Sequence, residues 1–99
     1  MEIIVDEVFS FKLNSGEELI AKVKIIDNNA IIVEEPVSVA PGPQGMGLVP
    51  SLFTAEPHGL VRLNTNSISL IAPTEDNVKM KYLEATTGIK VPSKKIVLG

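Results

Sequence analysis

Apolar and polar residues alternate along residues 9–39 with the two-residue period of β-strands. The apolar positions are Phe9, Phe11 and Leu13 in the first segment and Leu19, Ala21, Val23 and Ile25 in the second. This spacing puts one face of each strand in a core. Residues 14–16 and 27–29 separate the segments and contain Gly, Asn and Asp, which tolerate the positive φ angles of hairpin turns. We therefore predict three strands joined by two tight turns.

A stretch rich in proline and glycine follows these strands. Residues 40–50 contain three prolines, three glycines and no charged residue, so we predict a long loop without regular structure. The loop would expose Met46, Leu48 and Val49 to water. An apolar loop of this kind is typical of a contact surface between subunits or with a partner.

Strand character returns in the second half of the chain. Residues 60–63 and 68–72 are apolar segments on either side of the polar turn 64–67, which predicts a third hairpin. The residues expected on one face of the last strand are Ile68, Leu70 and Ala72. The core should therefore span about residues 9–72.

A helix is expected after Pro73, over about residues 75–87. Thr74 is a suitable N-cap, acidic residues follow it in the first turn, and Gly88 would end the helix. A tail of residues 89–99 follows. The residues predicted to share one stripe of the helix are Val78, Tyr82 and Ala85.

Composition favours a single all-β domain over residues 1–99. Eleven Ile and eleven Val supply much of the apolar content, and β-branched side chains suit pleated sheets. The mean hydropathy of +0.25 is high for a small soluble monomer, so we expect an oligomer. No apolar run is long enough to span a membrane, and no membrane partner is expected.

The lack of cysteine and the distribution of charge indicate the cellular compartment and the kinds of partner that we expect. The chain contains no cysteine, which excludes disulfides and thiolate metal sites, and acidic Glu2 and Asp6 stand where a signal peptide would be positive. We therefore expect a cytoplasmic protein. The net charge is −3, but residues 79–99 carry five lysines against one acid. These lysines form either a solvated tail or a basic patch.

No group of residues predicts catalysis, so we expect a protein that is not an enzyme and needs no cofactor or metal. His58 is the only histidine and has no cysteine or second histidine to complete a metal site, so we expect it to be exposed in a loop. The serines lack a nearby histidine motif. The glycines of residues 40–50 are not followed by the Lys-Ser or Lys-Thr pair of a phosphate-binding loop.

The segments SGEELIAKVKIIDNN and VRLNTNSISLI resemble the two sequence motifs of the Sm-like (Sm/LSm) family. The resemblance covers about two thirds of the chain, residues 9–72. Within the family, the chain looks most similar to small Sm-like proteins from phage and environmental sources. It implies a strongly bent, five-stranded, SH3-type open barrel, here with an added C-terminal helix. Two positions depart from the family pattern. Members that bind uridine-rich RNA carry an Asn where this chain has Ile31, and an Arg-Gly pair where it has Asn64 and Thr65.

The resemblance also implies a homo-oligomeric ring of about five to seven copies, in which the fourth strand of one subunit pairs with the fifth of the next. The residues that this implies for the subunit interface are Leu60, Val61, Leu63, Ile68 and Leu70. The residues that it implies for binding single-stranded RNA, in two polar turns and beside them, are Asp27, Asn28, Asn29, Arg62, Asn64 and Asn66. Lys90, Lys94 and Lys95 of the tail would add contacts with phosphates.

Two alternatives stay open at this point. Asn and Asp are also common in tight turns for backbone reasons alone, and no aromatic residue in either turn offers a surface for base stacking. The chain could therefore form a ring that serves as a structural or assembly scaffold for protein partners, with no nucleic-acid role. The acidic first strands favour the scaffold, whereas the polar turns and the basic tail favour RNA.

Overall fold

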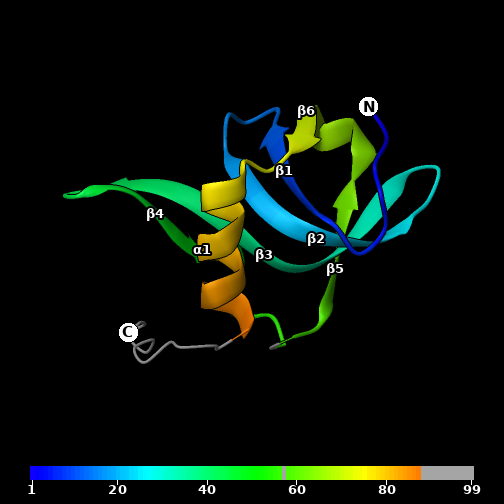
Figure 1. Ribbon diagram of the computed structural model, residues 1–99. Helices are drawn as coiled ribbons and strands as arrows, with labels where there is room; N and C mark the ends of the chain where they lie inside the picture. Colours follow the sequence, from blue (N-terminus) through cyan, green and yellow to red (C-terminus); the bar gives the residue numbers. More distant parts are fainter. Residues whose placement is uncertain (57, 88–99) are drawn as a thin grey trace.

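The computed structural model describes residues 1–56 and 58–87 and shows an antiparallel sheet with one helix packed against it (Figure 1). The elements are β1 (Val8–Leu13), β2 (Glu18–Ile26), β3 (Ala30–Gly42), β4 (Gly45–Pro50), β5 (Leu60–Asn64), the 3₁₀ turn η1 (Thr65–Ser67), β6 (Ile68–Pro73) and α1 (Asp76–Thr87). The prediction of a β-rich fold with a helix after the last strand is confirmed. The described residues form six strands, one more than expected. The predicted tail of residues 89–99 and its lysines lie outside the described residues, as does Gly88.

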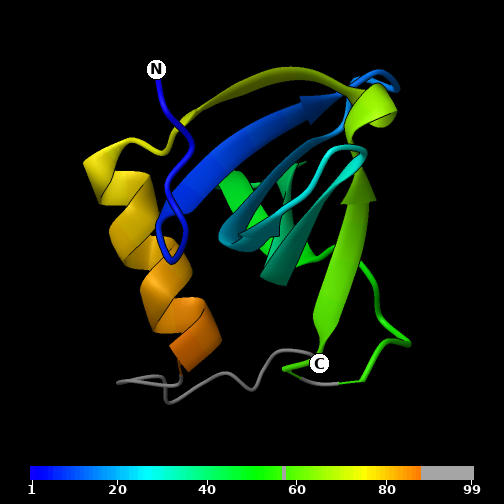
Figure 2. The ribbon, with the colours of Figure 1, turned by 90° about the vertical axis from the view of Figure 1, so that its right-hand side faces the viewer.

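The strand order is β4-β3-β2-β1-β6, and β5 pairs with β3. β3 is the longest strand: β2 lies along one of its edges, while β5 and β4 share the other edge, at Ala30–Glu34 and Val37–Gly42 respectively. Within the described residues β5 pairs only with β3 and β6 only with β1. The sheet therefore curls around its inner face without closing (Figure 2).

The inner face of the curled sheet holds the main core. Its fully buried members are Phe9, Phe11, Leu19, Ala21, Val23, Ile31 and Val33. Half-buried side chains from β5 and β6, together with Ile3, pack against this cluster. The alternation in β1 and most of β2 therefore predicted the inner face correctly.

A second apolar cluster lies on the outer face, between the sheet and α1. It contains Val8, Ile20, Val37 and Tyr82, with half-buried Val78, Leu83, Val39 and Leu48 packed against it. The alternation placed Ile25 in the core and left Ile20, between Leu19 and Ala21, off the core face; both predictions are wrong. Ile20 is buried beneath the helix, whereas Ile25 is 50% exposed because the register shifts between Val23 and Ile25.

Tyr82 fixes the helix at the point where β3 changes partners. Glu34 pairs with β5 and Val37 pairs with β4, and Glu35 between them has a φ of 53°. The Tyr82 hydroxyl donates toward two backbone carbonyls here, at 3.0 Å from Glu34 O and 2.9 Å from Glu35 O. Tyr82 is 1% exposed. The helix thus covers the bend in β3 and supplies a donor to its carbonyls.

The cap at the start of α1 differs from the predicted one. Glu75, not Thr74, accepts the backbone N–H of Val78, at 3.2 Å from Oε1. Thr74 is buried, and its hydroxyl is 2.9 Å from the hydroxyl of Ser10 on β1. The Thr74 hydroxyl, which we predicted to cap the helix, therefore bonds with Ser10 on β1 instead.

The predicted loop at residues 40–50 is wrong, because this segment forms the end of β3, a tight turn and β4. The Ser51 N–H donates to Pro36 O at 3.1 Å, so by the alternation of an antiparallel ladder Pro50 directs its nitrogen away from β3. Pro41 lies opposite Met46, beyond the last residue of β3 that pairs with β2. Neither proline removes a bond of the ladder, and Gly45, with a φ of 106°, closes the turn.

The predicted face of the last strand is also wrong. Leu70 pairs with Lys12 and Ile68 pairs with Leu13, so Ser69 is an extra residue that breaks the alternation. Ile68 and Ile71 therefore pack on the inner core. Leu70 instead lies on the outer side and is 65% exposed.

Replacing Tyr82 with Phe should lower the free energy of unfolding by about 1 kcal/mol, because the carbonyls of the β3 bend lose a buried donor while the ring still fills its site. Chemical denaturation followed by circular dichroism measures the change. Replacing Thr87 with Val, at the exposed end of the same helix, is the control and should have a smaller effect. An unfolding free energy of Tyr82→Phe equal to that of the wild type would contradict the role of the hydroxyl.

Alkaline pH should destabilise the fold through the same residue. Burial raises the pKa of the Tyr82 phenol above its ordinary value of about 10; the backbone at Lys22 opposes this shift, and the carboxylates of Glu35 and Glu34 add to it. The unfolded chain thus releases this proton at lower pH than the folded chain, so stability is lost as the pH rises above about 10. Tyr82 is the only tyrosine, so tyrosinate absorbance should appear together with unfolding. Ionisation near pH 10 in a folded chain would overturn this prediction.

Candidate functional site

The two polar turns that the sequence nominated lie side by side at one end of the sheet. Pairing of β3 with β5 places Ala30 opposite Asn64, and the Thr65 N–H donates to Asn29 O at 3.0 Å. Figure 2 shows the turn between β2 and β3 next to η1. Strand pairing therefore brings residues 27–29 and 64–67 into one surface.

The turn between β2 and β3 presents amide side chains to solvent. Asp27 uses its own carboxylate to hold the turn, since Oδ1 accepts the Asn28 N–H at 2.8 Å, and its N–H donates to Ala30 O at 2.9 Å. Asn28 and Asn29 are exposed. The carboxylate of Asp27 thus has a structural role, while the two amides remain at the surface as donors and acceptors.

Arg62 and Asn64 extend this surface along β5. Their side chains share one face of the strand, and Arg62 Nε donates to Asn64 Oδ1 at 3.0 Å. Both residues are exposed. The guanidinium, which carries further donors, therefore stands beside the two turns and supplies positive charge there.

Asn14 joins a third turn to this surface, and sequence analysis did not nominate it. Its amide Nδ2 donates to Asn66 O at 2.8 Å, its Oδ1 accepts the Ser69 hydroxyl at 2.6 Å, and its N–H donates to Ser67 O at 2.8 Å. Asn14 thereby holds η1 against the turn between β1 and β2. The sequence shows only a polar residue in a turn, because the contact crosses 52 residues of chain.

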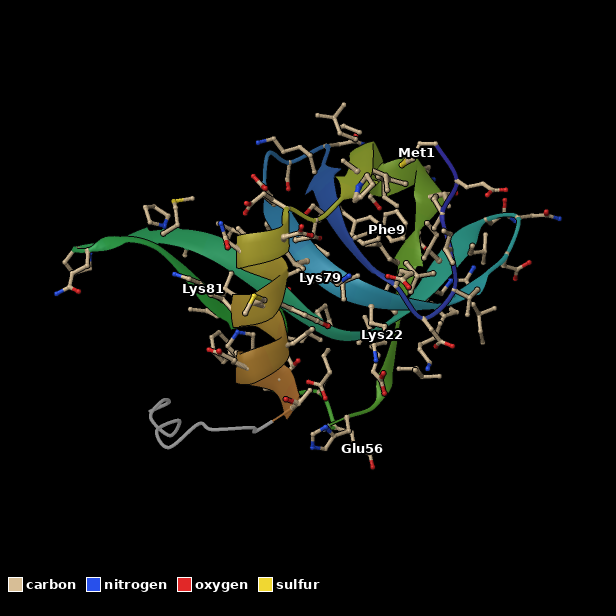
Figure 3. All side chains as sticks on the ribbon, in the orientation of Figure 1. Met1, Phe9, Lys22, Glu56, Lys79 and Lys81 are labelled. Atoms are coloured by element: carbon tan, nitrogen blue, oxygen red, sulfur yellow. The ribbon has the colours of Figure 1, made fainter. Side chains whose placement is uncertain are left out.

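The cations of the helix lie away from these turns. Lys79 and Lys81 project from α1 (Figure 3), and Lys79 Nζ lies 3.5 Å from Glu7 Oε1. On β2, Lys24 pairs with Asp6 at 2.7 Å. These two contacts fix the segment before β1 to α1 and β2. Hydrogen bonding to Lys24 lowers the pKa of the Asp6 carboxyl, and hydrogen bonding to Asp6 raises the pKa of the Lys24 ammonium.

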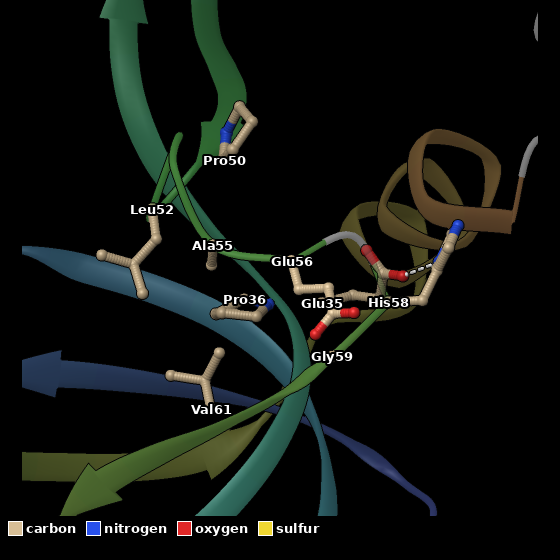
Figure 4. A pocket seen from close by; sticks show the side chains of 9 residues that line it. All are labelled: Glu35, Pro36, Pro50, Leu52, Ala55, Glu56, His58, Gly59 and Val61. Atoms are coloured by element: carbon tan, nitrogen blue, oxygen red, sulfur yellow. Dashed lines mark hydrogen bonds and ion pairs between the residues drawn. The ribbon is translucent and has the colours of Figure 1, made fainter.

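His58 has a partner that the sequence did not reveal. Its side chain is 76% exposed, as predicted, and Nδ1 lies 2.5 Å from Glu35 Oε2. The two residues border a shallow hollow of about 150 Å³ between β4 and β5 (Figure 4). Its lining residues are Glu35, Pro36, Pro50, Leu52, Ala55, Glu56, His58, Gly59 and Val61. The described residues contain no group of three or more acidic, histidine or cysteine side chains placed to hold a metal ion.

The residues nominated for a subunit interface divide into two sets. Val61, Leu63 and Ile68 are half-buried and pack on the inner core, so they belong to the fold of the subunit itself. Leu60 is 56% exposed and Leu70 is 65% exposed. Within the described part of the chain, β5 and β6 each have one edge without a partner strand, and Leu60 and Leu70 lie on these two strands. They are therefore the members of the set that a neighbouring chain can contact.

Comparison with known proteins adds no family to these observations. A scan against protein-family models found no match, and a search of the curated proteins found no similar sequence. Among the described residues, no helix has the length and apolar character needed to cross a membrane.

Proposed function

We propose that this chain is the subunit of an Sm-like homo-oligomeric ring that binds single-stranded RNA through its two polar turns. One observation carries the proposal: residues 27–29 and 64–67 meet at one end of a sheet whose strands β5 and β6 each pair with a single neighbour among the described residues. The turns supply a binding surface, and the two unpaired edges supply a means of repeating it around a ring. The arrangement needs no catalytic group, so we propose no enzymatic activity.

The ring is supported by the edges of the sheet. An unpaired edge strand exposes a row of backbone N–H and C=O groups that another strand can pair with. Pairing β5 of one subunit with β6 of the next would satisfy both rows and extend the sheet from copy to copy. It would also bring exposed Leu60 and Leu70 of neighbouring subunits to the same outer surface. Burial of these side chains would add apolar stabilisation to the backbone bonds.

RNA binding is supported by the chemistry of the turns. The side-chain amides of Asn28, Asn29 and Asn66 carry both donors and acceptors, as the edges of unpaired bases do. Arg62 can contact a phosphate or stack on a base. In a ring these groups recur once in each subunit, so an extended strand can contact several copies in turn. Lys90, Lys94 and Lys95, outside the described residues, would strengthen binding to any sequence through phosphates.

Replacing Leu70 with Lys should break the ring, because pairing would then bury a charge without a partner, which costs several kcal/mol. The side chain is exposed in the subunit, so the subunit should stay folded. Met80→Lys is the matched control, since Met80 is 60% exposed and lies on α1 and not on an edge strand. Sedimentation velocity should show a reduced mass for Leu70→Lys and an unchanged mass for Met80→Lys. The ring is refuted if Leu70→Lys keeps the full mass or the wild type is monomeric at micromolar concentration.

Replacing Asn29 and Asn66 with Ala should reduce the preference between uridine-rich and other single-stranded RNAs, because base edges lose their amide partners. Fluorescence anisotropy with two labelled oligonucleotides measures the ratio of affinities. Asn77→Ala, an exposed amide on α1, is the control and should keep the wild-type ratio. Replacing Lys90, Lys94 and Lys95 with Ala should instead weaken both RNAs alike and reduce the salt dependence.

The scaffold alternative has a distinct outcome in the same titration. Absence of binding to single-stranded RNA at low salt, in a wild type that still forms a ring, would refute the RNA role. The ring would then serve to assemble protein partners, and the Asn-rich turns would be explained by hairpin geometry.

A further inference from the structure

We infer that β4 is a second self-association surface, at which two copies of this chain pair their β4 strands about a twofold axis. The inference concerns the hairpin of β3 and β4, which extends beyond α1 and the rest of the sheet (Figure 1). It does not rest on the proposed ring, because β4 is a different edge from β5 and β6.

The outer edge of β4 is open to solvent in the part of the chain that the structure describes. Within the described residues β4 pairs only with β3, and every residue of β4 except Leu48 is exposed. Because Ser51 directs its backbone toward β3, alternation directs the backbone groups of Met46 and Leu48 toward the open edge, with the carbonyl of Pro50. Edge strands of soluble monomers normally carry charged residues that prevent pairing with another chain. β4 carries none.

The distribution of charge favours a second copy as the occupant. In a twofold contact, residues near the axis lie close to their own counterparts, so a charge there would meet a like charge. The chain has a net charge of −3, and residues 1–35 hold eight acids against three bases. Residues 36–55, by contrast, contain no charged side chain, yet they include Met46, which is 68% exposed. Two copies can therefore approach here without repulsion at the contact.

The backbone of β4 is self-complementary about Leu48. In an antiparallel pair centred on this residue, each Leu48 would exchange N–H and C=O bonds with its counterpart. The Met46 N–H of each copy would then face the Pro50 carbonyl of the other. Pro50 lacks an N–H, so the Met46 carbonyl of each copy would have no backbone partner in this register. The proline therefore allows one bond at this pair and ends the ladder there.

The hairpin is held in position before any partner arrives. Ser38 on β3 donates to the carboxylate of Glu17, and the Ser51 hydroxyl lies 3.0 Å from the Ser38 hydroxyl. Ser38 is 9% exposed, so these bonds are largely buried. On the other face Leu48 packs on the cluster beneath α1. A fixed strand loses little conformational freedom on association, which favours binding.

The Leu70→Lys variant, in which the ring contact should be lost, tests the β4 contact by itself. That protein should sediment as a dimer of about twice the 10.6 kDa chain mass, held by β4. Adding Met46→Pro removes a backbone N–H that points to the open edge. It should leave the ladder to β3 intact, because Pro41 and Pro50 already occupy equivalent positions in that ladder. The double variant should therefore be a monomer. Met46→Leu keeps the N–H and should remain dimeric. Monomeric Leu70→Lys protein, or a dimeric double variant, would overturn the inference.

A crosslinking experiment tests the register without a proline. The chain has no cysteine, so Leu48→Cys can form only an intermolecular disulfide. Across the proposed axis the two Cα atoms would be about 5.5 Å apart, which suits a disulfide. Mild oxidation should convert most Leu48→Cys protein to a covalent dimer, whereas Phe53→Cys, exposed but outside β4, should convert far more slowly. Equal conversion of the two variants would refute the proposed pairing.

Discussion

The pairing of β3 with three other strands is the constraint on which the rest of this structure depends. One edge of β3 is filled by β2, while the other is divided between β5 and β4. The division falls at Glu35 and Pro36, where a positive φ and a missing N–H interrupt a regular ladder. Tyr82 covers this break and donates to its carbonyls. The helix therefore stabilises the bend that lets one strand serve two partners.

Both proposed surfaces follow from that division. The first part of β3 brings Asn29 beside Thr65 and so joins the two polar turns. The second part carries β4 away from the curled core and leaves its outer edge in water. A straight, shorter β3 could join the two polar turns or carry β4 away from the curled core, but it could not do both. The proposed RNA surface and the proposed dimer contact are thus separate consequences of one strand.

The sequence predicted the parts of this fold that local pattern determines. Alternation identified the inner faces of β1 and most of β2, and Pro73 followed by acidic residues identified the start of α1, although Glu75 and not Thr74 caps it. It failed where a single inserted residue changes the facing, as at Ser69 in β6, and where a distant element buries a second face, as at Ile20 beneath Tyr82. Prolines suggested a loop at residues 40–50, because sequence does not show which backbone groups face an unpaired edge. The nominated turns do meet, but Asn14, which holds one of them in place, is recognisable only from contacts across the fold.

The central claim is that several copies of this surface act together on one RNA strand. Native mass spectrometry of the full chain with a single-stranded oligouridylate tests it most directly. The account predicts a closed assembly of about five to seven chains of 10.6 kDa, or twice that number if β4 joins two rings, with one oligonucleotide bound for each ring. A monomer or an open series of sizes, with RNA either absent or bound once for each chain, would contradict it.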